Sequence, residues 1–217
     1  IDINPKTPEV AKEFCDRGFT CHSVIANLGD AESLKNGFED AVKSLGGHLD
    51  IIVNGAGVQK RHPSEEFPYE DWEFVLNINL NAVFRLCQLA GKQFMAQGSK
   101  GKIINIASML SFFGGFTVPA YAASKGGVAQ LTKALCNEWA GKGINVNALA
   151  PGYMDTEMNT ALTDPSNPRF KEITDRIPAH VWGTPEDMKG PCVFLASAAS
   201  DYLNGAIIPV DGGYLVK

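Results

Sequence analysis

The sequence predicts a doubly wound α/β fold, in which a parallel sheet lies between two layers of helices. Short apolar runs rich in Ile and Val alternate along the chain with longer segments of helical periodicity. The runs are almost continuously apolar, which is typical of parallel strands buried on both faces. The 217 residues suit one domain over 1–217, and no repeat or change of composition indicates a second domain.

The expected elements follow this alternation in chain order. Strands are expected at 1–3, 21–26, 49–53, 102–106, 144–149 and 206–210. Helices are expected at 12–17, continuing a helix that begins after Pro8, and at 31–45, 69–96, 120–140 and 185–198. The helix over 69–96 is long enough to be bent. The longest irregular insert, 155–180, is polar and holds three prolines, so it predicts a mobile substrate lid over 155–182 or, alternatively, a variable loop.

The start of the chain differs from a complete fold of this class. Such folds begin with a strand, a Gly-rich turn and a helix, and the N–H groups of the turn hold the cofactor's pyrophosphate. Here residues 1–3 already look like the end of a strand, and no Gly-rich turn follows any strand near the N-terminus. We therefore expect the fold to lack its first strand and helix, as a fragment, a processed product or a natural short form.

Composition and charge exclude several classes of partner. Hydrophobic residues make up 45% of the chain and charged residues 20%, as in ordinary soluble proteins. The net charge of −5 comes without a basic block, so the electrostatic pattern of nucleic-acid binding is missing. No apolar run is long enough to span a membrane, and the start does not read as a signal peptide.

The cysteines and histidines indicate neither a disulfide framework nor a metal site. The five cysteines are scattered and form no Cys-x-x-Cys pair: Cys15, Cys21, Cys87, Cys136 and Cys192. This pattern favours reduced thiols in a cytoplasmic compartment. The four histidines show no ligand spacing, so no metal is expected.

The stretch 108–125 is where the chemistry is expected. Ser108 is followed by Tyr121 and Lys125, and a helix that starts near Pro119 places the tyrosine and the lysine one turn apart on the same face. Because a nearby positive charge favours the phenolate, Lys125 is expected to lower the pKa of Tyr121 and make it an acid and base near neutral pH. Taken alone the motif is weak, since Tyr-x-x-x-Lys also occurs by chance.

Three further stretches place small or polar residues at the ends of predicted strands, at 54–57, 107–108 and 150–152. In open α/β sheets ligands bind outside the carboxyl ends of the strands, and small residues let a backbone approach a ligand closely. Each stretch alone could be a tight strand-to-helix connection. Together with Tyr121 and Lys125, however, they converge on one crevice.

These residues resemble the short-chain dehydrogenases/reductases over essentially the whole chain. The matching motifs are 54–57, Asn79-Leu80 after Trp72, 104–108, 121–125, 145–148 leading into Pro151-Gly152, and 211–213. The stretches 101–112, 176–179 and 200–205 make the chain most similar to the members that act on deoxy sugar acids. Two positions depart from the family pattern: Gly55 replaces an asparagine, and Asn27-Leu28 stands where an aspartate and a hydrophobic residue are usual.

The resemblance implies a Rossmann-type oxidoreductase in which a nicotinamide cofactor carries the hydride. Tyr121 would be the general acid and base, and Lys125 would lower its pKa and bind the nicotinamide ribose. Ser108 would hold the reacting substrate oxygen. Asn79 would place a water that connects Lys125 to solvent. The residue-level alternatives are that Ser108 caps a helix, Asn79 sits at a helix bend and Tyr121 only packs.

The cofactor is expected to be NAD, with NADP possible. Asp2 lies at the end of the expected strand 1–3, which would be the second strand of a complete fold. There it can accept both ribose hydroxyls and repel a 2′-phosphate, unless it is a plain strand-end aspartate. The resemblance implies further contacts from Asn27 and Leu28 near the adenine, from Asn54, Ala56 and Gly57 on the adenosine-side ribose, and from Pro151, Gly152 and Thr156 at the nicotinamide end, beside Tyr121 and Lys125.

The expected substrate is a secondary alcohol or ketone of a sugar acid such as 2-deoxy-D-gluconate or 2-dehydro-3-deoxy-D-gluconate. Besides Ser108 and Tyr121, Lys60 and Arg61 could bind its carboxylate, although they could equally form a solvated basic turn. His180 is a further candidate on the lid. The alternatives are an NADPH-dependent 3-oxoacyl-type or other carbonyl reductase, and a cofactor-less scaffold subunit. A homotetramer is implied by the resemblance.

Overall fold

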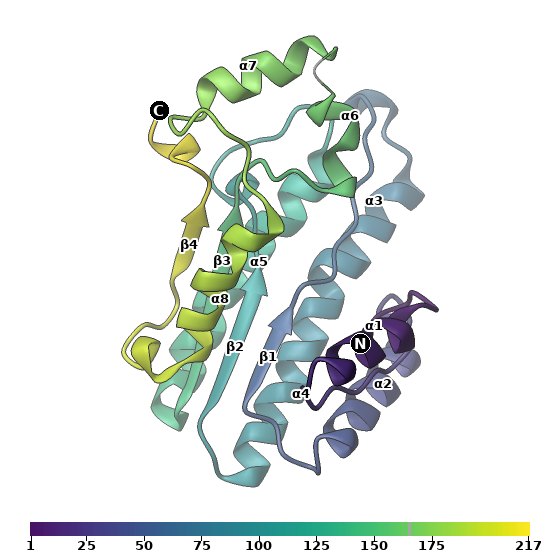
Figure 1. Cartoon of the computed structure of the whole chain (residues 1–217), viewed down its shortest axis with the longest axis vertical. Coiled ribbons are helices and arrows are strands. Elements are labelled where there is room, and N and C mark those ends of the chain that lie inside the picture. The colour runs from purple at the N-terminus through teal and green to yellow at the C-terminus, as the bar shows by residue number, and fades with distance from the viewer. Residues whose placement is uncertain (165) are drawn as a thin grey trace.

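The computed structural model describes residues 1–164 and 166–217, without the side chains of Met158 and Ala161, and contains one parallel four-stranded sheet (Figure 1). The strands lie side by side in chain order: β1 Ile51–Asn54, β2 Gly101–Ile106, β3 Ile144–Pro151 and β4 Ile207–Val210. Their register pairs Ile51 with Lys102, Gly101 with Ile144, and Ala148 with Ile207. The predicted doubly wound α/β class is confirmed.

Helices cover both faces of the sheet (Figure 1). They are α1 Thr7–Asp16, α2 Ala31–Ser44, α3 Tyr69–Leu76, α4 Ala82–Gln97, α5 Pro119–Trp139, α6 Thr160–Thr163, α7 Pro168–Arg176 and α8 Lys189–Ala196. Successive strand residues point to opposite faces. Ile103 accordingly joins the core under α2, α4 and α5, while Ile104 packs with Leu195 of α8 on the other face.

Glycine at the first position of β2 lets α4 pack directly on the sheet. A Cβ at Gly101 would lie 2.4 Å from ring atoms of Phe94, which is fully buried in α4. Real side-chain carbons never come that close, so any other residue would force the helix and the strand apart. The position therefore fixes how near α4 lies to β2.

The long helix predicted over 69–96 exists and is bent. α3 passes into a π-helical turn, Asn77–Asn81, before α4 continues to Gln97. Such turns place an extra residue in the helical ladder and bend its axis. Asn79 lies inside this turn and is fully buried.

The strands predicted at 1–3 and 21–26 are wrong as strands. The two segments meet only at one parallel bridge between Asp2 and Ile25, held by Asp2 N–H to Val24 O at 3.1 Å and Ala26 N–H to Asp2 O at 3.0 Å. Two backbone hydrogen bonds are too few for a strand ladder, and a pair of strands without further partners is only marginally stable. Ile1 and β1 line a common cavity of about 220 Å³. The strand order makes β1 an edge strand of the described sheet.

The segment predicted as an irregular lid is largely helical. Between the bridge at Met154 and Gly183 it forms a 3₁₀ turn, Glu157–Asn159, followed by α6 and α7. Asn167 caps α7 and Pro168 is its first residue, which is the usual place for proline in a helix. Pro165, inside the predicted lid, lies outside the described residues.

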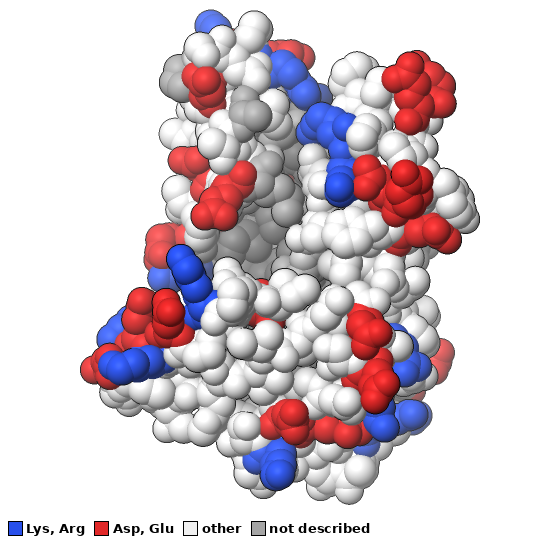
Figure 2. All heavy atoms as spheres, turned by 90° about the vertical axis from the view of Figure 1, so that its right-hand side faces the viewer, with Lys and Arg blue, Asp and Glu red and all other residues white. Residues whose placement is uncertain are grey.

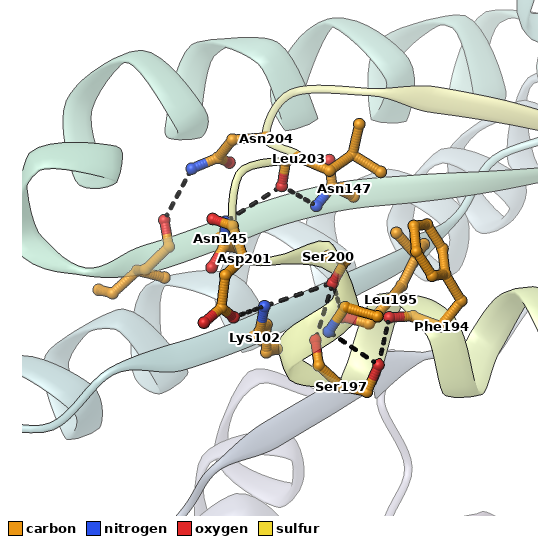
Figure 3. A network of polar contacts seen from close by, with 12 residues as sticks. Lys102, Asn145, Asn147, Phe194, Leu195, Ser197, Ser200, Asp201, Leu203 and Asn204 are labelled. Atoms are coloured by element: carbon orange, nitrogen blue, oxygen red, sulfur yellow. Dashed lines mark hydrogen bonds and ion pairs between the residues drawn. The ribbon is translucent and has the colours of Figure 1, made fainter.

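A hollow in the surface and a polar network lie at opposite ends of the sheet (Figure 2, Figure 3). Viewed from the right-hand side of Figure 1, the upper half of the molecule is hollowed, and Lys and Arg atoms run along one wall of the hollow (Figure 2). At the opposite end of the sheet, the turn before β4 is bound to β2 and β3 by a polar network (Figure 3). In the part of the chain that the structure describes, no helix is long and apolar enough to cross a membrane.

Candidate active site

Ser108 lies two residues after the end of β2 and caps the 3₁₀ turn Met109–Ser111. Its Oγ accepts the Leu110 N–H at 3.1 Å, and its own N–H donates to Ser111 Oγ at 3.3 Å. Ser111 Oγ in turn donates to the Lys125 carbonyl at 2.7 Å, which ties this turn to α5. Ser108 is thus a helix cap whose hydroxyl hydrogen is not used by the turn.

Tyr121 lies in the first turn of α5, against Ser108. Burial raises the pKa of Tyr121, and a side-chain hydrogen bond with Ser108 acts in the opposite direction. The prediction that Lys125 lowers the pKa of Tyr121 is therefore not confirmed in this structure. Burial is the larger of the two causes, and the Lys125 ammonium, 5.7 Å from the phenol ring centroid, donates to the Ile106 carbonyl instead.

Lys125 is a buried cation with spare donors. Its side chain is 3% exposed, and burial lowers its pKa from 10.5 to about 8. Its Nζ donates to the Ile106 carbonyl at 2.6 Å. An ammonium has three N–H donors, so others remain for the hydroxyls of a ribose, the role that the resemblance implies.

Asn79 connects the helix bend to the loop after β1 through side-chain hydrogen bonds. Its Oδ1 accepts the Val58 N–H at 2.8 Å, while its Nδ2 donates to Val58 O at 2.9 Å and to Ser124 Oγ at 3.2 Å. The alternative of a helix-bend residue is thus seen in the structure. Since the amide is fully engaged, a water placed by Asn79 would bind its backbone carbonyl, and this role stays a prediction.

Three of the six residues predicted for the adenosine side line one cavity. Leu28, Asn54 and Ala56 line the same space of about 220 Å³. Asn54 is buried, and its Nδ2 donates to Asn105 Oδ1 at 2.8 Å and to Cys87 Sγ at 3.3 Å. Within the described residues, Asn54 Oδ1 is the buried side-chain atom that lacks a hydrogen-bond partner. A free acceptor at this place fits a ligand that brings a donor.

Two predicted adenosine contacts already have bonds of their own. Asp2 Oδ1 accepts the Asn4 N–H at 2.9 Å, and the second carboxylate oxygen remains for a ribose. Asn27 Oδ1 accepts the Gly29 N–H at 3.0 Å, so the oxygen predicted to bind the adenine closes a local turn. Its amide nitrogen would make the contact.

At the nicotinamide end, Pro151 closes β3 and Gly152 touches the chain beyond β4. A Cβ on Gly152 would lie 2.7 Å from Asp211 Cα, so glycine is required there for packing. Gly57 is different, because a Cβ there would make ordinary contacts, 3.6 Å from Asn79 Oδ1 and 3.8 Å from Lys125 Nζ. Thr156 precedes a 3₁₀ turn without capping it, so its hydroxyl is not used by the turn.

A pocket of about 240 Å³ opens in front of Ser108 and Tyr121. Of the other predicted substrate residues, Arg61 lines it, whereas Lys60 and His180 are not among the lining residues. Lys60 Nζ instead pairs with Asp71 Oδ1 at 3.2 Å, and His62 Nε2 lies 2.8 Å from Asp71 Oδ2. The basic stretch after Gly57 therefore divides: Arg61 faces the pocket, and its neighbours bind α3.

The sequence did not point to several lining residues. They come from the insert and from the end of the chain: Tyr153, Asn159, Arg169, Glu172, Arg176 and Tyr214. Asp211 turns the end of the chain inward, since its carboxylate accepts the N–H groups of Gly213 and Leu215, each at 2.9 Å. The helical pattern of 168–176 would have placed Arg169, Glu172 and Arg176 on one face, but only had that segment been recognised as a helix.

Comparison with known proteins agrees with this geometry. A family model for Enoyl-(Acyl carrier protein) reductase, a short-chain dehydrogenase family, matches residues 1–215. The 2-dehydro-3-deoxy-D-gluconate 5-dehydrogenase of Escherichia coli (strain K12) is 52% identical over 218 residues, which cover 100% of this chain and 85% of the relative.

Solved structures give the same fold. A putative NAD(P) dependent gluconate 5-dehydrogenase from Beutenbergia cavernae, with bound NADP at low occupancy, superposes with a TM-score of 0.93 at 46% identity, over 99% of this chain and 85% of that one. A gluconate 5-dehydrogenase from Burkholderia cenocepacia J2315, in complex with NADP and tartrate, gives 0.92 at 38% identity, over 100% and 86%.

Proposed function

The chain belongs to the short-chain dehydrogenase/reductase family, and on that premise we propose that it is an NAD(P)-dependent oxidoreductase of a sugar acid. The reaction interconverts a secondary alcohol and a ketone, with 2-dehydro-3-deoxy-D-gluconate as the first candidate substrate and 2-deoxy-D-gluconate as the second. The observation that carries the proposal is that Ser108 and Tyr121 line a pocket with three arginines, while Lys125 is buried one helical turn from Tyr121.

The side chains have complementary tasks in this reaction. The nicotinamide, when bound, accepts or supplies the hydride. In the oxidation Tyr121 takes the hydroxyl proton, and in the reduction it returns one to the same oxygen. Ser108 donates a hydrogen bond to that oxygen and stabilises its negative charge. Lys125, held by the Ile106 carbonyl, would donate its remaining N–H groups to the cofactor ribose.

The described residues fit an NAD(P) cofactor along the carboxyl ends of the strands. Asn54 offers a free buried acceptor, Lys125 offers donors and Thr156 has an uncommitted hydroxyl. Asp2 favours NAD, because a carboxylate repels a 2′-phosphate. The Beutenbergia and Burkholderia relatives were solved with NADP, so the two cofactors must be compared directly.

The names of the relatives and the charge of the pocket support a sugar acid. Relatives that act on deoxygluconate and gluconate all take carboxylate substrates, and the Burkholderia enzyme was solved with tartrate, which is itself a carboxylate. Arg61 places a cation in the corresponding pocket of this chain. A guanidinium is well suited to carboxylate recognition.

The experiment is a substrate and cofactor comparison on the purified chain. NADH or NADPH formation and oxidation would be followed with 2-dehydro-3-deoxy-D-gluconate, 2-deoxy-D-gluconate, their keto forms and a 3-oxoacyl thioester. We expect turnover of a sugar acid, with NAD(H) preferred. Turnover of the thioester alone, with NADPH, would establish the reductase alternative. Absence of NADH and NADPH binding in a fluorescence titration would support the scaffold alternative.

We also propose a cytoplasmic homotetramer with a predicted lid over 155–182. All five cysteines are free, in keeping with a reducing compartment. Phe74 and Phe84, on α3 and α4, are exposed and could pack in an interface between copies. Sedimentation equilibrium would test the assembly, and a monomer at working concentration would rule it out.

A further inference from the structure

Two arginines face the substrate pocket without an acidic partner. Arg61 comes from the loop after β1 and Arg169 from α7, and both line the space in front of Ser108 and Tyr121. Among the described residues, neither forms an ion pair. They also repel one another: the pKa of Arg61 is lowered mainly by burial and then by the positive charge of Arg169.

Arg61 is held in place independently of any ligand. Its Nη1 donates to Phe116 O and to Thr117 Oγ1, each at 3.0 Å. Thr117 has a positive φ of 61°, which is unfavourable for a β-branched residue. The loop carries this strain while the His62 N–H bonds the Thr117 carbonyl at 3.1 Å. Arg61 is therefore a cation held in position by the loop. Arg169, in the insert, places a second cation in the same pocket.

The other charged groups of the pocket do not cancel this pair. Arg176 stacks on the Tyr214 ring, with its guanidinium carbon 4.3 Å from the centroid, and so has a packing task. Glu172 lines the same pocket, but it forms no ion pair with Arg61 or Arg169 in the described structure. The pocket thus has three arginines against one glutamate, and its uncompensated charge lies at Arg61 and Arg169.

We propose that Arg169, together with Arg61, binds the carboxylate of the substrate and thereby selects acids over neutral sugars. This inference rests on the proposed sugar-acid function and names the residues that would enforce it. An anion between the two guanidiniums removes their mutual repulsion and gains charge-assisted hydrogen bonds. The carboxylate end is then held by Arg61 and Arg169, while the reacting carbon lies at Ser108 and Tyr121.

The test removes this charge and compares acid and neutral substrates. Arg169→Gln should raise KM for the sugar acid about 10- to 100-fold and change kcat by less than about threefold, because the lost bonds serve binding in ground and transition states alike. The methyl ester of the same sugar acid should react equally with wild type and variant. Arg169→Lys should restore part of the affinity, since it keeps the charge but loses the bidentate geometry.

Lys171→Gln is the matched control. This substitution removes one positive charge from the same helix. Lys171 pairs with Asp175 and is not a lining residue of the pocket. Its KM should equal that of wild type. A binding measurement without turnover completes the design: tartrate should raise the thermal midpoint of wild type and Lys171→Gln and leave that of Arg169→Gln unchanged.

The outcomes separate this inference from the proposed function. If wild type turns over the sugar acid and Arg169→Gln keeps its KM and its response to tartrate, the inference is overturned and the function stands. If tartrate protects the protein through Arg169 while no sugar acid reacts, the carboxylate site stands and the function falls. An equal loss with acid and methyl ester would assign Arg169 to general packing and also overturn the inference.

Discussion

The two ends of the sheet use polar side chains in opposite ways. In the network before β4, Asn147 Nδ2 donates to Leu203 O at 2.9 Å and its Oδ1 accepts the Ala206 N–H at 3.0 Å (Figure 3). Asn204 likewise accepts the Val146 N–H at 2.8 Å and donates to the Ile144 carbonyl at 3.2 Å. At the carboxyl end, in contrast, the Lys125 ammonium donates to one acceptor, and the acceptor Asn54 Oδ1 has no donor.

This contrast separates groups that hold the chain from groups that await a ligand. A buried polar atom with every bond made stabilises the fold and offers nothing to a substrate. A buried atom with unused bonding capacity costs stability, and it is retained where a ligand can complete it. The following variants test this division, from the largest expected effect to the smallest.

Tyr121→Phe should reduce turnover about 10²- to 10⁴-fold, because the phenol hydroxyl is the proton donor and acceptor of the reaction. Cofactor affinity should stay within about twofold of wild type, since the ring remains in place. Steady-state rates and a fluorescence titration with NADH would measure the two quantities. Substantial remaining activity would remove Tyr121 from its role as acid and base.

Lys125→Met should stabilise the protein while it abolishes useful activity. With a pKa of about 8 in the fold against 10.5 as the ordinary value, the protonated side chain is disfavoured by about 3 kcal/mol at neutral pH. Loss of the bond to the Ile106 carbonyl offsets about 1 kcal/mol of the gain. Urea denaturation should therefore show a net increase of about 2 kcal/mol.

The pH dependence gives the matching signature for Lys125. Between pH 8 and 10.5 this lysine binds more protons in the unfolded chain than in the native protein, so the stability of wild type relative to Lys125→Met should rise with pH across this range. A wild-type stability that falls in that range, measured against the variant, would contradict the assignment of a lowered pKa.

Asn147→Ala should lower the stability and leave turnover almost unchanged, which is the reverse of the effect of Lys125→Met. It leaves the Ala206 N–H without its partner and removes one of the two side-chain donors to the Leu203 carbonyl, the other being Asn145, so the free energy of unfolding should fall by about 2 kcal/mol. The turnover of the folded fraction should stay within about twofold of wild type. A large loss of turnover at unchanged stability would break the division between the two ends.

Lys102→Met should produce the smallest change, and one that depends on acidity. Lys102 Nζ lies 2.7 Å from Asp201 Oδ1, and this hydrogen bond holds the pKa of Asp201 below its ordinary value of 3.8. The pair therefore contributes stability above pH 3.8 that is lost as the pH falls through the lowered pKa. Acid unfolding curves of wild type and variant should differ near neutral pH and converge at low pH.

The sequence predicted the catalytic half of the fold well, because its signals are local. Tyr121 and Lys125 lie on one helix, Ser108 lies two residues after a buried strand, and β2 and β3 fall within two residues of their predicted bounds. The bend at Asn79 followed from the length of the helix, although the π-helical turn itself needed the structure. These features depend on periodicity and on the place where strands end.

The remainder depends on contacts between distant segments. The pair at Asp2 and Ile25 looked like two strands from composition, but a strand also requires a partner ladder. The helices of the insert were hidden by polar sequence and prolines, one of which begins α7. The pocket role of Tyr214 arises from the Asp211 turn, and the raised pKa of Tyr121 arises from burial. None of these can be read from residue type and spacing.

The inward turn at Asp211 has a consequence for how this enzyme's specificity can change over time. Tyr214 is 4% exposed, packs with Met109 and Ile173, and also lines the pocket. Substitutions in the last turn of the described chain can therefore alter substrate preference while Ser108, Tyr121 and Lys125 remain untouched. A directed-evolution library confined to 214–216 can therefore explore new substrates while the two glycines of the turn and the three catalytic side chains are kept.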